Sequence, residues 1–114
     1  MYNNLTYSQI GNKLKMRIIS IKTIKDFWEN KKYRDAEQPL KAWYHEAKRA
    51  EWKNSGAIKG KYNSASILAN GRVVFNIKGN QYRLVAAVNY KFQIIFIRFI
   101  GTHAEYDKID AKTI

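Results

Sequence analysis

The first hydrophobic positions of the chain predict one short strand followed by a helix. RIISI at 17–21 is an apolar run typical of a β-strand. The apolar positions then recur at helical spacing, with Ser20 or Thr23 as the expected N-terminal cap and Asp26 completing an arrangement close to a capping box. The apolar face of this first helix consists of Ile24, Phe27 and Trp28.

A second helix is predicted from near Pro39 to Trp52 or Lys53, after a charged turn at 31–35. Proline is favoured in the first turn of a helix, where its missing N–H would have no partner. The apolar positions repeat at i, i+3, i+4 and i+7 and form a face of Leu40, Trp43, Tyr44, Ala47 and Ala50. His45 lies off this face, so we expect it to be exposed to solvent.

The stretch 54–66 is the part of the chain richest in Gly, Ser and Asn. This composition predicts a long loop or lid, with Lys59 and Lys61 exposed on it. Long connections in compact domains are often functional, but a mobile loop without a function fits the same composition equally well.

The second half of the chain alternates with the period of two that is typical of β-strands. We expect strands at 73–77, 82–90 and 93–100, joined by turns at 78–80 and at Lys91. In the strand 82–90, Arg83 shares one face with Val85, Ala87 and Asn89. The strand 93–100 is apolar on both faces, which indicates a central position in the sheet. A short turn or helix is expected at 102–110.

These elements follow one another in the order β-α-α-β-β-β. Helices that precede a run of strands favour an α+β fold, with two N-terminal helices packed on a mainly antiparallel sheet. We expect residues 16–114 to form a single domain. Residues 1–15 show little periodicity, and Met16 stands directly before the first strand, so we expect 1–15 to be a flexible extension or a non-native start.

The composition indicates in which cellular compartment the protein works and what kind of partner it binds. The chain has no cysteine, which excludes disulfides and thiolate metal sites and favours a reducing cytoplasm. No apolar stretch approaches the roughly 18–20 residues that span a bilayer. Lys and Arg number 21 against nine Asp and Glu, giving a net charge of +12. Such a surface attracts nucleic acid or an acidic protein, although a basic surface that only aids solubility is the alternative.

Two positions near the C-terminus combine side chains that can exchange protons. His103 follows Gly101 and Thr102 at the end of an apolar strand, which is a rim position where side chains converge on ligands. Histidine is the side chain suited to proton transfer near neutral pH. Tyr106 would lie on the same side of a helical turn. A histidine at a strand end and a tyrosine packed on the core are the structural alternative.

Two arginines interrupt otherwise apolar strands. Arg83 must reach water, a carboxylate or a phosphate, and an internal ion pair is the alternative to a functional role. Arg98 is likewise open to either an ion pair or a functional role, and it is expected on the face of Ile94, Phe96 and Ile100. The two histidines, His45 and His103, are too far apart in sequence to form a recognised metal-ligand spacing.

Four segments together resemble the HigB-type toxins of the RelE/ParE-like superfamily: MRIISIKTIKDFWE, LKAWYHEAKRAEW, VVFNIKGNQYRLVAAVNY and IIFIRFIGTHAEYDKI. The resemblance covers residues 16–110, and its most specific parts are FNIxGNxYRLV and THxEYD. It implies a RelE-like fold and an mRNA interferase, an endoribonuclease that needs no metal or cofactor and cleaves mRNA on the translating ribosome. The implied partner is a helix-turn-helix antitoxin of HigA type, which inhibits the toxin in a complex that represses its operon. No membrane partner is implied.

The resemblance also implies roles for individual residues. Arg83 occupies the position of the superfamily's phosphate-binding arginine, His103 would be the general acid or base, and Tyr106 would orient the RNA or share proton transfer. RelE has two lysines where this chain has Val74 and Asn76, so the base cannot be transferred from RelE. The residues predicted to bind RNA, some of which could replace that base, are Lys59, Lys61, Lys78, Lys91, Asn76 and Arg98.

Two other functions remain compatible with the sequence. One is a non-catalytic nucleic-acid-binding module or a ParE-like toxin that inhibits DNA gyrase. The other is a degenerate toxin retained as an antitoxin-binding or repressor component. The pair His103 and Tyr106 argues against the gyrase inhibitor, because ParE-like toxins need no proton-transfer pair.

Overall fold

Five strands form one sheet in the order β1-β5-β4-β3-β2. The computed structural model describes residues 16–114, so the extension expected at 1–15 lies outside the described residues. The β1–β5 pairing is parallel and the other three pairings are antiparallel, which confirms the mainly antiparallel sheet. The strands are β1 (Arg17–Ile19), β2 (Ser66–Ile67), β3 (Arg72–Ile77), β4 (Tyr82–Asn89) and β5 (Ile94–Thr102).

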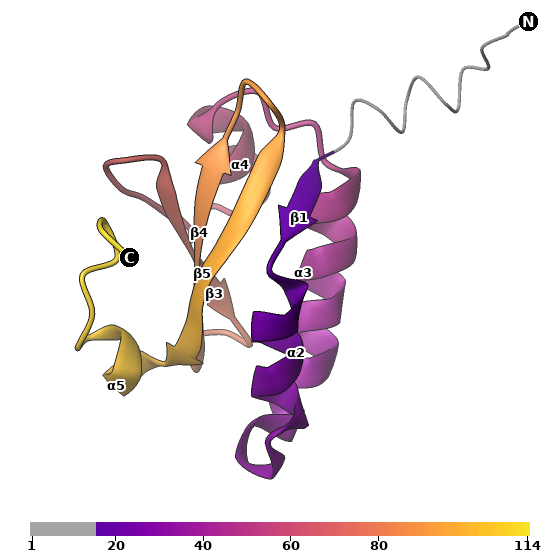
Figure 1. The fold of residues 1–114 in the computed structure, drawn as a ribbon, viewed down its shortest axis with the longest axis vertical. Helices are drawn as coiled ribbons and strands as arrows, with labels where there is room; N and C mark the ends of the chain where they lie inside the picture. Colours follow the sequence, from indigo (N-terminus) through magenta and orange to yellow (C-terminus); the bar gives the residue numbers. More distant parts are fainter. Residues whose placement is uncertain (1–15) are drawn as a thin grey trace, which may run out of the picture.

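Helices cover one face of this sheet, and the C-terminal segment lies on the other side (Figure 1). No helix within residues 16–114 is long and apolar enough to cross a membrane. The helical elements are α2 (Ile21–Glu29), the 3-10 helix η1 (Lys31–Ala36), α3 (Glu37–Arg49), α4 (Ser55–Lys61) and α5 (His103–Tyr106). The prediction of an α+β fold with two N-terminal helices packed on the sheet is confirmed, and η1, α4 and β2 are additional elements.

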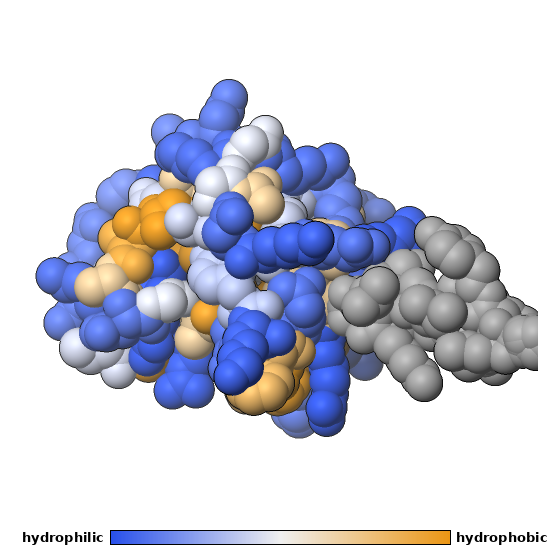
Figure 2. Space-filling view, turned by 90° about the horizontal axis from the view of Figure 1, so that it is seen from above, coloured by the Kyte–Doolittle hydropathy of each residue, from blue (hydrophilic) through white to orange (hydrophobic). Residues whose placement is uncertain are grey.

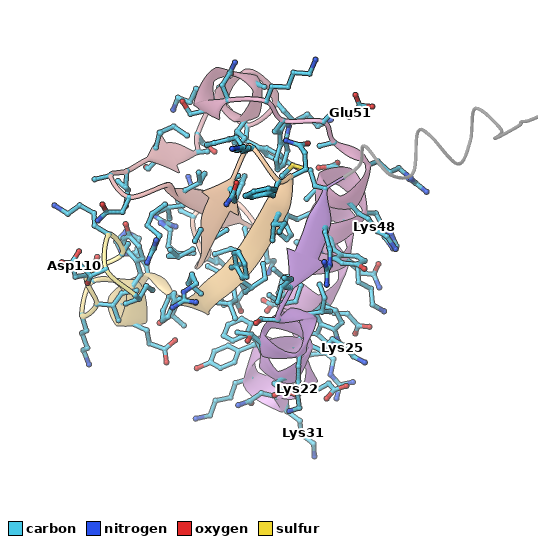
Figure 3. All side chains as sticks on the ribbon, turned by 45° about the horizontal axis from the view of Figure 1, so that its top comes forward. Lys22, Lys25, Lys31, Lys48, Glu51 and Asp110 are labelled. Carbon is cyan, nitrogen blue, oxygen red and sulfur yellow. The ribbon has the colours of Figure 1, made fainter. Side chains whose placement is uncertain are left out.

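The main core lies between the sheet and the helices. Alternate residues of β3 and β4, among them Phe75 and Leu84, are buried against Ile24 of α2 and Leu40 of α3. The lysines of α2 and α3 that Figure 3 labels, together with Lys31 of η1, point outward, on the opposite side of the molecule from Asp110. This division follows from the amphipathic pattern, since only one face of each helix is apolar.

A second, smaller core lies on the opposite face of the sheet. Val74 and Val85 are buried there together with Ala111 of the C-terminal segment. Two side chains hold this segment against the sheet: Arg72 Nε donates to the backbone oxygen of Ile114 at 2.9 Å, and Asn70 Nδ2 donates to that of Lys112 at 3.0 Å. The segment that follows α5 is thereby tied to β3, which fixes where α5 sits.

The loop or lid predicted at 54–66 is wrong, because most of it forms helix α4 and the short strand β2. Asn54 caps α4 by accepting a hydrogen bond from the backbone N–H of Ala57 at 3.0 Å. Ile58 is fully buried, so the helix is held by the core. Gly and Ser lower helix propensity, and this one buried apolar side chain outweighs them.

The predicted helix ends also need correction. Ser20 stands at the N-cap of α2 but has a φ of 72° and makes no side-chain cap, and Thr23 lies inside the helix. Helix α3 begins two residues before Pro39 and ends at Arg49, earlier than predicted. Trp52 is nevertheless buried in the main core, although it lies beyond the end of α3 in a stretch without regular secondary structure. The charged turn at 31–35 is the 3-10 helix η1.

A β-bulge overturns the placement of Arg98. Opposite Val85 and Ala86 of β4 stand Phe99 and Ile97 of β5, so Arg98 has no partner in the ladder. A bulge residue breaks the alternation of side chains along a strand. Ile100 therefore packs on the main core and does not share the face of Ile94 and Phe96 as predicted, and Arg98 itself is exposed.

Candidate active site at one end of the sheet

Three neighbouring residues form a row across one end of the sheet. Asn76 of β3 pairs with Arg83 of β4, and Arg83 pairs with Gly101 of β5. Alternation puts this row on the face of Val74 and Val85, away from α2 and α3. Arg83 and Asn76 thus lie beside the end of β5, where α5 begins.

The guanidinium of Arg83 is half-buried and bonded to backbone oxygens. Its Nη1 donates to the backbone oxygen of Asn80 at 2.9 Å and, more weakly, to that of Tyr82 at 3.5 Å. Within residues 16–114 it forms no ion pair with a carboxylate, so the internal ion pair considered from the sequence is wrong. No carboxylate therefore occupies the guanidinium, and its other N–H groups remain as donors for an anion.

Gly101 allows two side chains to pack closely beside Arg83. A Cβ atom at this position would lie 2.6 Å from Cζ of Phe99 and 2.8 Å from Oε1 of Glu105. Both distances are shorter than any real carbon contact. Glycine is therefore required here for the Phe99 ring and the Glu105 carboxylate to reach the strand.

A capping box fixes the start of α5 and with it the position of His103. The backbone N–H of Glu105 donates to Thr102 Oγ1 at 3.1 Å, and the backbone N–H of Thr102 donates to Glu105 Oε1 at 2.8 Å. His103 is the first residue of the helix, and its side chain is 55% exposed. The imidazole is therefore displayed at the rim of the sheet, as the sequence predicted.

Asp107 pairs with the imidazole and was not predicted from the sequence. Its Oδ2 lies 3.2 Å from Nδ1 of His103, four residues earlier. A carboxylate at Nδ1 favours the tautomer that carries its proton there and leaves Nε2 as the accepting nitrogen. The i, i+4 spacing in HAEYD carried this signal, because residues four apart are neighbours on a helix.

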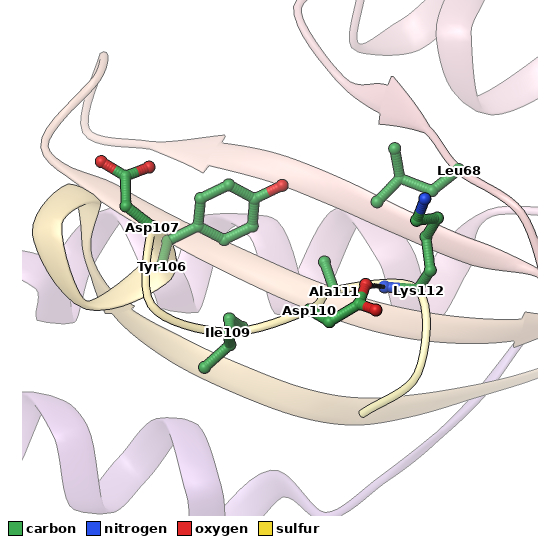
Figure 4. A pocket seen from close by; sticks show the side chains of 7 residues that line it. All are labelled: Leu68, Tyr106, Asp107, Ile109, Asp110, Ala111 and Lys112. Carbon is green, nitrogen blue, oxygen red and sulfur yellow. Dashed lines mark hydrogen bonds between the residues drawn. The ribbon is translucent and has the colours of Figure 1, made fainter.

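Tyr106 faces the sheet instead of the solvent. It is half-buried and packs against the cluster of Val74, Val85 and Ala111. It also lines a hollow of about 360 Å³ with Leu68, Ile109 and the segment that follows. Figure 4 shows its ring reaching over the hollow toward Leu68, whereas the carboxylate of Asp107 points away. Within residues 16–114 no hydrogen bond joins Tyr106 to His103, so the two side chains occupy different environments.

Arg83 and His103 lie close enough to act on one group. Paired Cα atoms such as those of Arg83 and Gly101 are about 5 Å apart in an antiparallel ladder. His103 follows two residues later, which adds about 7 Å along an extended chain. An arginine side chain and an imidazole can both reach a phosphate across this separation.

Lys78 lies at the same end of the sheet but already has a partner. Its Nζ is 2.7 Å from Oδ2 of Asp35, and the Tyr82 hydroxyl donates to Oδ1 of Asp35 at 2.5 Å. These two bonds hold the pKa of Asp35 below its usual value. Burial and the bond to Asp35 raise the pKa of Tyr82 to about 12. Lys78 therefore joins the β3–β4 turn to η1.

The other predicted RNA-binding residues do not gather around Arg83. Lys59 Nζ donates to the backbone oxygen of Ala65 at 2.6 Å, and Lys61 is exposed at the end of α4. Lys91 lies in the β4–β5 turn, and β4 separates it from His103 by about 23 Å. Asn76 does lie in the row, with Nδ2 3.3 Å from the backbone oxygen of Ser64.

Charge is unevenly divided along the chain. From 52 to 104 there are eight Lys or Arg residues and no Asp or Glu, and this stretch contains β2, β3, β4 and β5. Six of the nine acidic residues lie between 26 and 51, within or close to the helices. Within residues 16–114 no group of three or more His, Asp or Glu is placed to hold a metal ion. The stretch that contains four of the five strands is therefore rich in positive charge, and the remaining three acidic residues, Glu105, Asp107 and Asp110, follow it in the C-terminal segment.

Comparison with known proteins identifies the family. A family model of HigB toxins, described as the RelE-like toxic component of a toxin–antitoxin system, matches residues 36–109. The mRNA interferase toxin HigB of Escherichia coli K12 is 32% identical over 94 residues, which cover 81% of this chain and 88% of the relative. Proteins named mRNA interferase HigB from Escherichia coli O157:H7 and Shigella flexneri match equally well. The chain therefore belongs to the HigB family of RelE-like toxins.

Proposed function

We propose that this chain is the toxin of a type II toxin–antitoxin system and cleaves mRNA as an endoribonuclease. The observation that carries the proposal is the placement of an uncompensated arginine, Arg83, and an exposed histidine, His103, at one end of a cationic sheet. The names of the HigB relatives, which are mRNA interferases, support the same activity.

RNA supplies the nucleophile for this reaction. The 2′-hydroxyl attacks the adjacent phosphorus, its proton passes to a base, and the bond from phosphorus to the 5′-oxygen breaks. The products are a 2′,3′-cyclic phosphate and a 5′-hydroxyl, because the leaving 5′-oxygen takes a proton from water. The protein needs a group that accepts a proton and a cation for the charge that develops on the phosphoryl oxygens.

The residues at the end of the sheet match these needs. Nε2 of His103 accepts the proton of the 2′-hydroxyl, with Asp107 holding the tautomer through Nδ1. Arg83 binds the phosphoryl oxygens through the N–H groups that it does not give to Asn80. Tyr106 orients the RNA, since its half-buried ring lines a hollow together with Leu68 and Ile109, where a base can stack.

The expected setting is the translating ribosome. A net charge of +12 favours binding to the polyanionic surface of ribosomal RNA, and electrostatic steering accelerates such encounters. The inhibitor would be a cognate helix-turn-helix antitoxin of HigA type. It would act by covering the end of the sheet that carries Arg83 and His103, in a complex that represses the operon.

Growth arrest on expression tests the proposal. We expect Arg83→Ala and His103→Ala each to relieve the arrest while far-UV circular dichroism and thermal unfolding stay close to those of the parent. His45→Ala is the matched control, because His45 is the other histidine and is exposed on α3. If both folded variants of the end-of-sheet residues remained fully toxic, the assignment of the site would be wrong.

Primer extension on translated mRNA distinguishes cleavage from other forms of toxicity. New 5′ ends are expected in cells that express the parent protein and are expected to be absent with His103→Ala. Replication arrest without new 5′ ends would instead support a gyrase inhibitor of ParE type. Cleavage of the same mRNA with and without ribosomes would show whether the ribosome is required.

A further inference from the structure

The β4–β5 turn displays an aromatic ring at the opposite end of the sheet from Arg83. Phe92 is 65% exposed, the largest exposure of any large hydrophobic side chain within residues 16–114. The other such side chain is Ile67 on the edge strand β2, at 41%. Exposing a phenylalanine this far gives up the free energy of its burial, so its surroundings are informative.

Three side-chain hydrogen bonds hold the turn that carries Phe92. Its own backbone N–H donates to Asn89 Oδ1 at 3.0 Å. Gln93 takes a positive φ of 55°, and its Nε2 donates to the backbone oxygens of Trp52 at 2.7 Å and of Tyr90 at 2.8 Å. The ring is thus presented by a braced backbone, which limits the entropy lost when a ligand packs on it.

One cation lies against the ring, and others stand close to the turn. Lys91 Nζ lies 5.6 Å from the centroid of Phe92. Lys91 and Lys53 line a hollow of about 270 Å³ beside the turn, together with Glu51 and two polar or aromatic neighbours. Arg17 begins β1 next to the turn, and its backbone N–H donates to the backbone oxygen of Gln93 at 2.8 Å. Seen from this end, hydrophilic side chains cover most of the surface and hydrophobic ones form small patches (Figure 2).

This combination suits single-stranded RNA better than a protein. An exposed ring can stack on any base, while lysines on a flexible stem neutralise the phosphates on either side. The centre of a protein interface is instead depleted of lysine, because its charge would have to be desolvated. Here Lys91 lies beside the ring, Lys53 lines the adjoining hollow with it, and Glu51 is the one acid among the residues that line that hollow.

We propose that Phe92, Lys91 and Lys53 form a second contact for single-stranded RNA, separate from the end of the sheet that carries Arg83. The length of β4 sets the two ends about 23 Å apart. Stacked nucleotides advance about 3.4 Å each, so about seven of them span the distance. The contact binds RNA without reacting with it, and it does not depend on cleavage.

Binding of a short RNA tests this contact. A fluorescein-labelled single-stranded 12-mer is titrated with the full chain carrying His103→Ala, and fluorescence anisotropy gives Kd. Adding Phe92→Ala is expected to weaken binding by about 5- to 150-fold, the range for loss of one stacked base. Phe92→Trp should restore it. Ile67→Ala is the matched control, since it removes the other exposed large hydrophobic side chain.

The salt dependence tests the lysines separately. Lys91→Ala and Lys53→Ala should each reduce the slope of log K against log salt by about 0.7, the value for one phosphate contact on a single strand. Lys25→Ala on α2 should leave the slope unchanged. Circular dichroism confirms that each variant is folded.

Three outcomes would overturn the contact. Phe92→Ala could bind the 12-mer as tightly as its parent, Ile67→Ala could weaken binding equally, or poly-glutamate could bind in a Phe92-dependent manner while RNA does not. An assay of mRNA cleavage by the protein with His103 intact is read independently. Phe92-dependent binding without any cleavage would contradict the proposed function and leave this contact standing.

Discussion

His103 is distinguished from the other histidine of the chain by what touches its ring. His45 lies on the exposed face of α3, where Tyr44 is its aromatic neighbour at 5.5 Å between ring centroids. His103 instead has the carboxylate of Asp107 at Nδ1 and stands two residues after Gly101, the ladder partner of Arg83. A carboxylate in this position orients an imidazole and stabilises the imidazolium that forms when it accepts a proton.

A substrate with a sulfur at the 5′ bridging position tests whether His103 is base or acid. A thiolate leaves without a proton, so such an RNA no longer needs a general acid. If His103 is the base, His103→Ala is expected to remain impaired on the sulfur substrate by about 100- to 10,000-fold, the usual size of acid–base catalysis. Recovery of the parent rate on this substrate, measured by gel electrophoresis of the products, would assign His103 as the acid.

The Asp107 contact and the Tyr106 hollow show what residue-level reasoning from sequence missed. The sequence put His103 at the rim of the sheet with Tyr106 near it and Arg83 on a neighbouring strand, and in the structure Arg83 and His103 lie at the same end of the sheet while Tyr106 packs on the sheet face. It did not predict that Tyr106 would pack against Val85, because this requires the C-terminal segment to fold back across the sheet. That fold-back depends on Arg72 and Asn70, whose partners lie 42 residues away in sequence.

At the scale of elements, periodicity predicted the strands well and the irregular parts poorly. Strands β3 and β4 were found within one residue of their bounds, because both are apolar runs rich in β-branched residues that end at polar turn residues. Helix α4 was missed, since one buried side chain, Ile58, holds a segment of low helix propensity. The bulge at Arg98 was missed as well, because it arises from pairing with β4 and has no local signature in a run of apolar residues.

Gly101→Ala tests how the junction of β5 and α5 supports the site. The added methyl would force the Phe99 ring and the Glu105 carboxylate to move, and Glu105 holds the capping box of α5. We expect a loss of about 1–3 kcal/mol in the free energy of unfolding, measured by urea denaturation, as for other overpacked sites. The rate of mRNA cleavage should fall as well, because His103 is the first residue of α5 and moves when the helix start moves.

Gly60→Ala in α4 is the control for this variant, because a Cβ atom added there would meet nothing within 4 Å. The double variant Gly101→Ala with Phe99→Leu removes the nearest ring atoms and should recover part of the lost stability. Unchanged stability and activity in Gly101→Ala would show that the close packing beside Arg83 is not needed.

At the scale of the whole molecule, the helix layer and the sheet are joined by polar contacts as well as by the core. Asp35 in η1 accepts hydrogen bonds from Lys78 and Tyr82. The Tyr82 ring also packs edge-on against the ring of Phe27 in α2, with 5.2 Å between the ring centroids. On the far side of α3, Glu46 accepts a short hydrogen bond from the Tyr62 hydroxyl. Both phenols are buried or half-buried beside a carboxylate, which disfavours their ionised forms.

This arrangement predicts that the fold loses stability in alkali. The folded pKa of Tyr82 is raised to about 12 by burial and by Asp35, and that of Tyr62 is raised by burial and by Glu46. A tyrosine whose pKa is higher in the folded than in the unfolded protein stabilises the folded state. This stabilisation is complete below the unfolded pKa of about 10, and it is lost as the pH rises through the folded pKa. The urea midpoint should therefore fall between pH 10 and 12. Tyr82→Phe should make the fall of the urea midpoint smaller. Tyr44→Phe is the control, because no hydrogen bond joins its hydroxyl to a carboxylate within residues 16–114, and it should leave the fall unchanged. A urea midpoint that does not depend on pH over this interval would contradict the explanation.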